Sequence, residues 1–385
     1  MKKVLYGTTA LVAVGAMAAV PAAAEEGVTL GLGGYYNTYF GIGGHDEANS
    51  DPRDLGFAGL FADGEVHFKG KTTLDNGITF GVQIELEAFQ SGDQIDENYA
   101  FIEGSFGRFV IGGENSAAYM MQFAAPNVGV PLNSGWITSF VGIPPGQTTG
   151  FRTVALSTYV DIGNDNHGIT YYSPRFSGFQ IAGSWVPTPD PGGSRNGNGE
   201  GRNSPVFAFE ESEMNNLLSI GANFVETFGD FDVAVSGGYR IAWMPDSPNP
   251  GEDDDEVQQI SAGLVLGYAG FSVGGSYANE DSSRLIGGQS VDGWSYDVGA
   301  SYSTGPWAVG VTWFQSEVEG SATTMVDPVT FGSGDDELTA LEVGISYAVG
   351  PGITASLSGL WGEFEEEDGD DSSSIVGIVG MKIGF

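Results

Sequence analysis

The sequence predicts an all-β fold, a 16-stranded antiparallel β-barrel that spans a membrane. Three observations lead to this prediction. Apolar and polar residues alternate along most of the chain, short turns alternate with long loops, and aromatic residues flank the short turns. A strand of a membrane barrel has one face toward lipid and the other toward the lumen, and an even number of strands places the short turns at one rim.

Composition and charge exclude several classes of protein. Charged residues make up 16% of the 385 residues, whereas soluble proteins contain about 25%. The 50 acidic and 13 basic residues give a formal charge of −37, which would repel nucleic acid, so we expect no nucleic-acid partner. The absence of cysteine excludes disulfides and thiolate metal sites.

The N-terminal segment resembles a targeting signal in its arrangement of charge and hydrophobicity. Lys2 and Lys3 precede an apolar run over residues 4–20, and "PAAA" then supplies small residues for cleavage. We expect residues 1–24 to be a cleaved signal peptide and residues 25–385 to be the barrel. No later run of 18 or more apolar residues predicts a helical membrane span, so the exported protein would be periplasmic, secreted or an outer-membrane barrel. The periodicity described next favours the barrel, and with it the outer membrane of a Gram-negative bacterium.

Period-two alternation locates the strands. In "GITFGVQIELEAF", Ile78, Phe80 and Val82 alternate with small or polar residues over a length sufficient to cross a bilayer. The prolines are consistent with the assignment, because they fall in the signal peptide, in loops, in turns or at strand ends. The expected strands are residues 28–40, 59–74, 78–90, 95–104, 107–114, 167–173, 178–186, 214–227, 230–243, 256–269, 270–280, 292–304, 306–319, 336–350, 351–364 and 373–385.

The connections between these strands alternate in length. Short turns such as "LDNGI", "GSFGR" and "VGPG" separate longer segments rich in Gly, Pro, Asn and Asp. Sixteen strands are enough to leave an aqueous channel, whereas eight strands fill their own interior with side chains. Two aromatic girdles are expected, one at Phe106, Phe109, Phe176, Phe179, Phe228, Phe231, Tyr268, Phe271 and Trp307, and one at Phe40, Trp185, Trp243, Tyr277, Trp313 and Trp361.

The turn "DNG" predicts the register of the second hairpin. A three-residue loop with Gly77 in the left-handed region places Leu74 opposite Ile78. A two-residue loop would put Lys71 opposite Val82, with charge and apolar surface on one face, so strand parity rejects it. The expected cross-strand pairs are Phe68 with Ile84, Val66 with Leu86, Lys69 with Gln83, His67 with Glu85, and Glu65 with Glu87.

Charged residues on the polar faces are candidates for the wall and constriction of a lumen. An alternative is that they form cross-strand pairs that stiffen the wall without a functional role. We interpret His67 opposite Glu85 as a hydrogen-bonded pair rather than a metal ligand, because no second histidine is near in sequence. The candidates are the basic residues Lys69, Lys71, Arg152 and Arg240, the acidic residues Glu85, Glu87, Glu114, Asp232, Asp297 and Glu342, and His67.

Two acidic runs lie in expected outer loops, "GEDDDE" at 251–256 and "EFEEEDGDD" at 363–371. Carboxylate oxygens suit Ca²⁺, but neither run has EF-hand spacing, so solvated acidic loops are the alternative. Acid at the mouth of a channel would in either case concentrate cations. A structural calcium is the one cofactor considered, at Asp253, Asp254, Asp255, Glu365, Glu366 and Glu367.

Enzymatic motifs are absent from the sequence. The chain has three histidines and no Gly-x-Ser-x-Gly elbow, P-loop or HExxH. We therefore expect no catalytic residues.

Several stretches resemble the general trimeric porins of Gram-negative bacteria, particularly the alphaproteobacterial ones. They are "TTLDNGITFGVQIELEA", "NYAFIEGSFGRFVIGG", "YYSPRFSGFQIAGSW" and the terminal "GMKIGF". The resemblance covers the whole mature chain and implies a homotrimer in outer-membrane lipid that passes small hydrophilic solutes and ions by passive diffusion. It also implies that Phe385 is an assembly signal for the barrel-assembly machinery.

The same resemblance implies a long third loop that folds into the barrel, here from about Asn115 to Asn166. The family's loop usually carries acidic residues, whereas this one holds only Arg152, Asp161 and Asp165 as charges. We therefore expect the acids of the constriction to come from the wall, as Glu114 would. The expected function is a diffusion porin with some cation preference. Two alternatives are a substrate-preferring outer-membrane channel and an exported calcium-binding β-rich surface protein.

Overall fold

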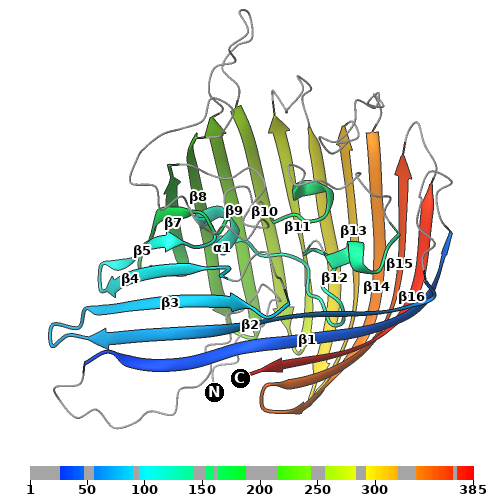
Figure 1. The fold of residues 1–385 in the computed structure, drawn as a ribbon, viewed down its shortest axis with the longest axis horizontal. Helices are drawn as coiled ribbons and strands as arrows, with labels where there is room; N and C mark the ends of the chain where they lie inside the picture. The colour runs from blue at the N-terminus through cyan, green and yellow to red at the C-terminus, as the bar shows by residue number, and fades with distance from the viewer. Residues whose placement is uncertain are drawn as a thin grey trace, which may run out of the picture.

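The computed structural model confirms a closed antiparallel barrel with sixteen strands in the part of the chain that it describes (Figure 1). These residues are 27–46, 56–89, 95–134, 136–142, 153–159, 164–187, 215–243, 256–282, 292–319, 335–366 and 371–385. Each strand pairs with its neighbours in sequence, and β1 closes the barrel against β16.

The strands agree with the predicted set to within a few residues at most ends. They are β1 (Thr29–Asp46), β2 (Ala58–Thr73), β3 (Thr79–Glu87), β4 (Asn98–Gly104), β5 (Gly107–Gly113), β6 (His167–Tyr172), β7 (Phe179–Val186), β8 (Asn215–Phe228), β9 (Phe231–Trp243), β10 (Glu256–Tyr268), β11 (Phe271–Ser282), β12 (Gly293–Thr304), β13 (Trp307–Glu319), β14 (Asp335–Gly350), β15 (Ile353–Glu366) and β16 (Ser372–Gly384).

The largest boundary error is at β1, which ends six residues beyond the predicted residue 40. Glycines in "GIGG" interrupt the side-chain alternation there, but the main chain continues to pair with β16 as far as Asp46 opposite Ser373. Side-chain pattern therefore underestimates a strand whose inner face carries glycine.

The predicted register of the β2–β3 hairpin is confirmed. Phe68 pairs with Ile84 and His67 with Glu85. Gly77 has φ of 79°, and the N–H of Leu74 donates to the carbonyl of Ile78 at 2.9 Å. The three-residue turn thus sets which side chains of both strands point inward.

The outer face of the barrel is apolar. Phe68, Val82, Val298 and Val343 are 43–55% exposed, and their neighbours in sequence point to the opposite face. Rings gather beside the short turns, where Phe231 and Tyr268 have centroids 4.4 Å apart and Trp307 and Tyr347 4.6 Å apart. Such a surface suits lipid with an aromatic girdle at one interface.

The connection from β5 to β6, residues 114–166, is called the third loop below. It contains α1 (Ala117–Met121) and two short 3₁₀ helices, η1 (Trp136–Ser139) and η2 (Thr153–Ala155). No helix in the described residues has the length and apolar character needed to cross a membrane. The strand side chains that the third loop contacts alternate with the lipid-facing ones, and in a closed barrel they lie on the inner face.

Candidate functional site

The third loop is attached to the inner wall by hydrogen bonds from its backbone N–H groups. Ala117 donates to Ser184 Oγ on β7 at 2.8 Å, and Ala118 to Ser219 Oγ on β8 at 2.9 Å. Further along, Phe123 donates to Ser236 Oγ on β9 at 2.8 Å. Loop carbonyls are bonded in the same way, as when Thr312 Oγ1 on β13 donates to the carbonyl of Pro126 at 2.9 Å.

Two of the predicted lumen acids belong to this attachment. Asp297 on β12 accepts from the N–H of Ala125 at 3.0 Å, and its Oδ2 also accepts from Asn133 Nδ2 at 2.8 Å. Glu342 on β14 accepts from the N–H of Val130 at 3.0 Å. Both side chains are buried, at 3% and 0% exposure. They lie on the inner face as predicted, but beneath the loop rather than in open lumen.

Arg240 on β9 requires the same correction. The sequence prediction groups it with Lys69 and Lys71 in a basic wall, but it is 1% exposed and its guanidinium donates to Ser116 and to Asn164 Oδ1. It lies seven strands away from Lys69 and Lys71 around the barrel. Strand parity places a residue on the inner face but does not show what covers it.

An apolar cluster inside the barrel completes the attachment. Val130, Leu132 and Ile137 of the third loop are fully buried, and they pack against wall residues that include Phe314 and Leu360. Full burial of such side chains stabilises by roughly 1.5–3 kcal/mol each, against about 0.5–1.5 kcal/mol for a typical hydrogen bond. The loop is therefore fixed to the wall by apolar contacts as much as by polar ones.

Strands β2 to β5 form the part of the wall where charged residues gather, here called the acidic wall. The loop's hydrogen bonds to strands run from β7 round to β16, whereas this sector carries carboxylates beside the start of the loop, where Asn115 Nδ2 donates to Glu97 Oε1. Glu85 and Glu97 are buried, and the others are partly exposed. The acidic wall consists of Asp63, Glu65, Glu85, Glu87, Glu97 and Glu114.

The predicted basic residues lie nearer the short turn. Lys69 pairs with Gln83 and Lys71 with Gly81, one step further toward residues 75–77, and Lys71 is exposed. Asp232 also lies near a short turn and accepts from Thr227 Oγ1 at 2.7 Å. Arg152 lies outside the described residues. Along β2 and β3, the acids Glu65, Glu85 and Glu87 therefore lie farther from the short turn than these two bases.

Burial perturbs the carboxyl groups that lie just beyond the strand ends. Glu114, next to β5, is only partly exposed, and burial raises its pKa to about 7. Burial, together with the charges of Asp165 and Asp96, raises the pKa of Glu97 well above its ordinary value. Removing these groups from water disfavours their charged form. Glu114 should therefore change charge near neutral pH.

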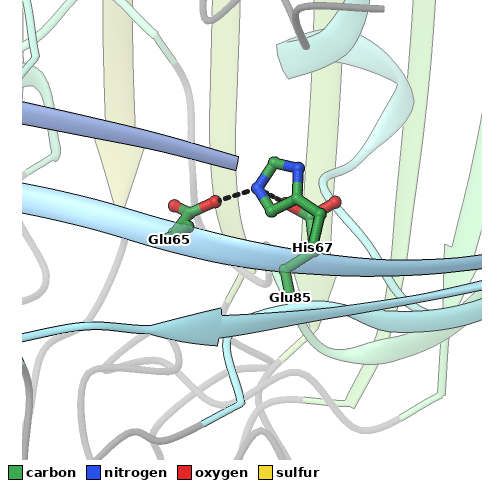
Figure 2. Close-up of side chains that lie close together, drawn as sticks. All are labelled: Glu65, His67 and Glu85. Atoms are coloured by element: carbon green, nitrogen blue, oxygen red, sulfur yellow. Dashed lines mark hydrogen bonds and ion pairs between the residues drawn. The ribbon is translucent and has the colours of Figure 1, made fainter. Parts of the chain in front are cut away.

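Glu65 and Glu85 of the acidic wall and the neighbouring His67 point toward one another (Figure 2). His67 Nε2 lies 2.7 Å from Glu65 Oε2 and 2.8 Å from Glu85 Oε2. The predicted contact between His67 and Glu85 is therefore present. Glu65 joins it from the same strand, two residues before His67. These three residues, and separately Glu65 with Asp96 and Glu97, each bring candidate metal-ligand atoms within 4.8 Å of one another.

The sequence prediction does not include several polar residues of the inner wall. Asp63 and Arg108 occupy inward positions of β2 and β5, so strand parity alone would have found them, whereas Glu97 precedes β4. Arg108 lies 4.3 Å from the ring centroid of Phe101. The grouping of Glu97 with Glu65 carries no local signal, because Glu65 lies on β2 and Glu97 lies more than 30 residues later, before β4.

The calcium prediction falls mostly outside the described part of the chain. Asp253, Asp254, Asp255 and Glu367 are not described, nor is the side chain of Glu366. Glu365 is exposed at the end of β15. Calcium binding at these residues stays a prediction.

A family model described as Gram-negative porin matches residues 7–367 of the sequence. A comparison with curated proteins finds no match. Several solved structures are similar, including the outer membrane channel DcaP of Acinetobacter baumannii, with a TM-score of 0.60 and 12% identity over 93% of this chain and 98% of that chain.

Two further solved structures share the architecture. The anion-selective porin from Comamonas acidovorans has a TM-score of 0.56 and 14% identity over 93% of this chain and all of its own. OmpT, an outer membrane protein of Vibrio cholerae in a trimer form, has a TM-score of 0.54 and 12% identity over 94% of this chain and all of its own. At these identities the likeness concerns the fold alone.

Proposed function

The chain belongs to the Gram-negative porin family, and on that premise we propose that it passes small hydrophilic solutes and ions across the outer membrane by passive diffusion. A closed barrel of sixteen strands has room for an aqueous lumen. The apolar outer face and aromatic residues beside the short turns match lipid and its interface. Diffusion through such a lumen needs no cofactor and no energy source.

We propose that the third loop narrows the lumen. Its attachment to β7, β8, β9, β12, β13, β14 and β16 holds it against one side of the inner wall. The loop residues Met120, Ser134, Thr138 and Ser139 are exposed and uncharged. The size limit would then be set between these residues and the acidic wall.

We propose a preference for cations, and one observation carries this proposal. Beside the start of the third loop, the acidic wall holds six carboxylates on β2 to β5 and the residues next to them, and His67 lies among them. A low-dielectric wall lined with one sign of charge concentrates counter-ions. The two lysines of this sector lie closer to the turns, so they oppose the effect only beyond the narrow region.

Reversal potentials in planar bilayers under asymmetric KCl test this proposal. The wild type should favour K⁺, and the double substitution Asp63→Asn with Glu87→Gln should reduce that preference. Asp75→Asn with Asp230→Asn removes the same charge from two short turns and should change it less. A wild type that prefers Cl⁻, or an acidic-wall variant with unchanged selectivity, would contradict the proposal.

The substrate-preferring alternative has one observation in its favour. The rings of Phe61 on β2 and Trp136 on η1 have centroids 5.0 Å apart and are both only partly buried on the inner side. Aromatic faces there could retain a particular solute. Conductance that saturates with one solute class but not with others would favour this alternative over general diffusion.

We further propose that residues 1–24 are removed on export and that residues 25–385 assemble as a homotrimer. The trimer form of the similar OmpT structure supports this assembly. For Phe385 as an assembly signal, the support is its position at the closing seam, where it exchanges backbone hydrogen bonds of 3.0 and 3.1 Å with Gly34.

A further inference from the structure

We propose that Glu65, His67 and Glu85, extended by Asp96 and Glu97, form a binding site for a divalent transition-metal ion of the Zn²⁺ type. This proposal concerns ion binding to the wall and goes beyond the proposed diffusion function. Only its effect on conductance rests on that function. Glu65 and His67 lie on β2 and Glu85 on β3 (Figure 2). Asp96 and Glu97 precede β4.

Two carboxylates converge on a single nitrogen of His67. Glu65 Oε2 lies 2.7 Å and Glu85 Oε2 2.8 Å from His67 Nε2. A ring nitrogen carries one proton at most, so it cannot donate a full linear hydrogen bond to both. One metal ion can contact all three atoms at once. The side chains are nearly buried, with 7% of His67, 11% of Glu65 and 8% of Glu85 exposed.

Neighbouring donors hold each carboxylate in place by its other oxygen. The hydroxyl of Tyr35 donates to Glu65 Oε1 at 2.7 Å, and the side-chain amide of Gln83 donates to Glu85 Oε1. Both Oε2 atoms are thereby directed toward His67. Outer partners of this kind orient the ligands of metal sites and increase their affinity.

A further carboxylate of the cluster, that of Glu97, has an oxygen without a hydrogen-bond partner in the described part of the chain. Glu97 is 8% exposed, and its Oε2 is buried and accepts no hydrogen bond within the described structure. Its Oε1 accepts from Asn115 Nδ2 at 2.8 Å. Backbone bonds from Glu85 N to Glu97 O, and from Asp96 N to Glu85 O, keep this segment beside β3. Candidate ligand atoms of Glu65, Asp96 and Glu97 lie within 4.8 Å of one another.

The excess of negative charge in the cluster favours binding of a cation. Two carboxylates contact the imidazole, and two more, of Asp96 and Glu97, lie near Glu65. The described ion pairs of Glu65 and Glu85 are both with His67. Buried carboxylates are costly unless they are paired or coordinate a metal. A bound dication would neutralise two of these charges.

The ligand types indicate which ion. Calcium prefers oxygen ligands alone, whereas imidazole with carboxylate suits zinc and similar ions. Zinc binds nitrogen and oxygen at about 2.0–2.2 Å, so its ligands lie roughly 3 Å or slightly more from one another. The present separations of 2.7 and 2.8 Å need to widen only slightly to admit an ion. Neutral His67 would then ligate through Nε2.

Titration of the detergent-solubilised protein with Co²⁺ and Zn²⁺ tests the proposal. Co²⁺ should give visible absorption bands that Zn²⁺ abolishes, and calorimetry should give one tight Zn²⁺ site per chain. Excess Ca²⁺ throughout would occupy the acidic outer loops. The substitution His67→Gln should weaken Zn²⁺ binding at least about 10-fold, the lower end of what loss of even an outer partner costs.

The chain offers matched controls, because it has only two other histidines and no cysteine. His45→Gln and His167→Gln alter residues that bond Ser374 and Asn98, and both variants should bind Zn²⁺ as the wild type does. Heat-modifiable gel mobility would verify that each variant is folded. Equal affinity in His67→Gln and wild type, or no Zn²⁺ binding in excess Ca²⁺, would show that His67 is only an imidazolium shared by two carboxylates.

Failure of the metal site and failure of the channel remain distinguishable. Spectra and calorimetry report binding without any conductance. If the protein forms channels as proposed, micromolar Zn²⁺ should also lower the cation preference of the wild type, and His67→Gln should remove that response. Binding without a change in selectivity would leave the site intact and contradict only its effect on ion flow.

Discussion

At the scale of single residues, acidic side chains of the inner wall have two different roles. Asp297 and Glu342 accept backbone N–H groups of the third loop and are buried. Asp63, Glu87 and Glu114 are partly exposed on the opposite sector. Sequence makes these acids equivalent, because each lies on an inward face or next to one. Their neighbours decide whether they attach a loop or contribute charge to a lumen.

The raised pKa of Glu114 predicts a dependence of ion selectivity on pH. With a pKa of about 7, the group is neutral below this pH and negative above it. Wild type and Glu114→Gln should therefore have the same K⁺/Cl⁻ permeability ratio at pH 5, and the wild type should have the higher ratio at pH 8. Reversal potentials measured over this range check the prediction, and a difference that does not vary with pH would contradict it.

At the scale of elements, a long loop is held inside the barrel because strands provide both acceptors and space. Serine, aspartate and glutamate side chains accept its N–H groups in succession around the wall. Gly263 on β10 provides the space, because a Cβ there would collide with the backbone carbonyl of Phe123. A small residue at this position lets the two backbones approach closely.

Replacing Gly263 should therefore displace the third loop. Overpacking typically costs about 1–3 kcal/mol, and a backbone atom cannot rotate away as a side chain can. Gly263→Val should push the loop away from the wall into the lumen, lowering single-channel conductance and excluding larger solutes. Gly237→Val is the matched control, because residue 237 faces outward on the adjacent β9 and its nearest contact would be 3.9 Å away. Equal conductance in both variants would show that the loop is not held there.

At the scale of the whole molecule, barrel closure lets the protein expose its apolar side chains. β1 pairs with β16 from Tyr35 opposite Gly384 to Asp46 opposite Ser373, so neither strand is left as an edge. Lipid is the medium that suits the exposed face. The main buried apolar cluster instead lies within the barrel, between the third loop and the strands that bind it.

The lipid-facing assignment predicts how the cost of a charge depends on depth. Val298, in the middle of β12, is 49% exposed. Val298→Arg should destabilise the barrel by about 2–4 kcal/mol, whereas Thr304→Arg, on the same face beside a short turn, should cost about 0–1 kcal/mol. Reversible denaturant unfolding in lipid vesicles measures both values. Equal costs for the two variants would contradict the proposed membrane position.

The local sequence pattern was sufficient to predict the strands and the register of the β2–β3 hairpin. Alternation along "GITFGVQIELEAF" and the turn "DNG" set the inward faces of β2 and β3, and the structure confirms their pairing. Glycine was the exception, because the glycines of "GIGG" interrupt the alternation and the end of β1 was predicted too early. These features depend on a residue and its near neighbours, so they can be read along the chain.

Only the tertiary structure decided the burial of Arg240 beneath the third loop and the grouping of Glu97 with Glu65. Arg240 is buried because Ser116 and Asn164, more than 70 residues away in sequence, lie against it. Glu97 lies near Glu65 because β3 pairs with β2 on one side and bonds the segment before β4 on the other. Period-two alternation determines which way a side chain points, but contacts between distant segments determine what it meets there.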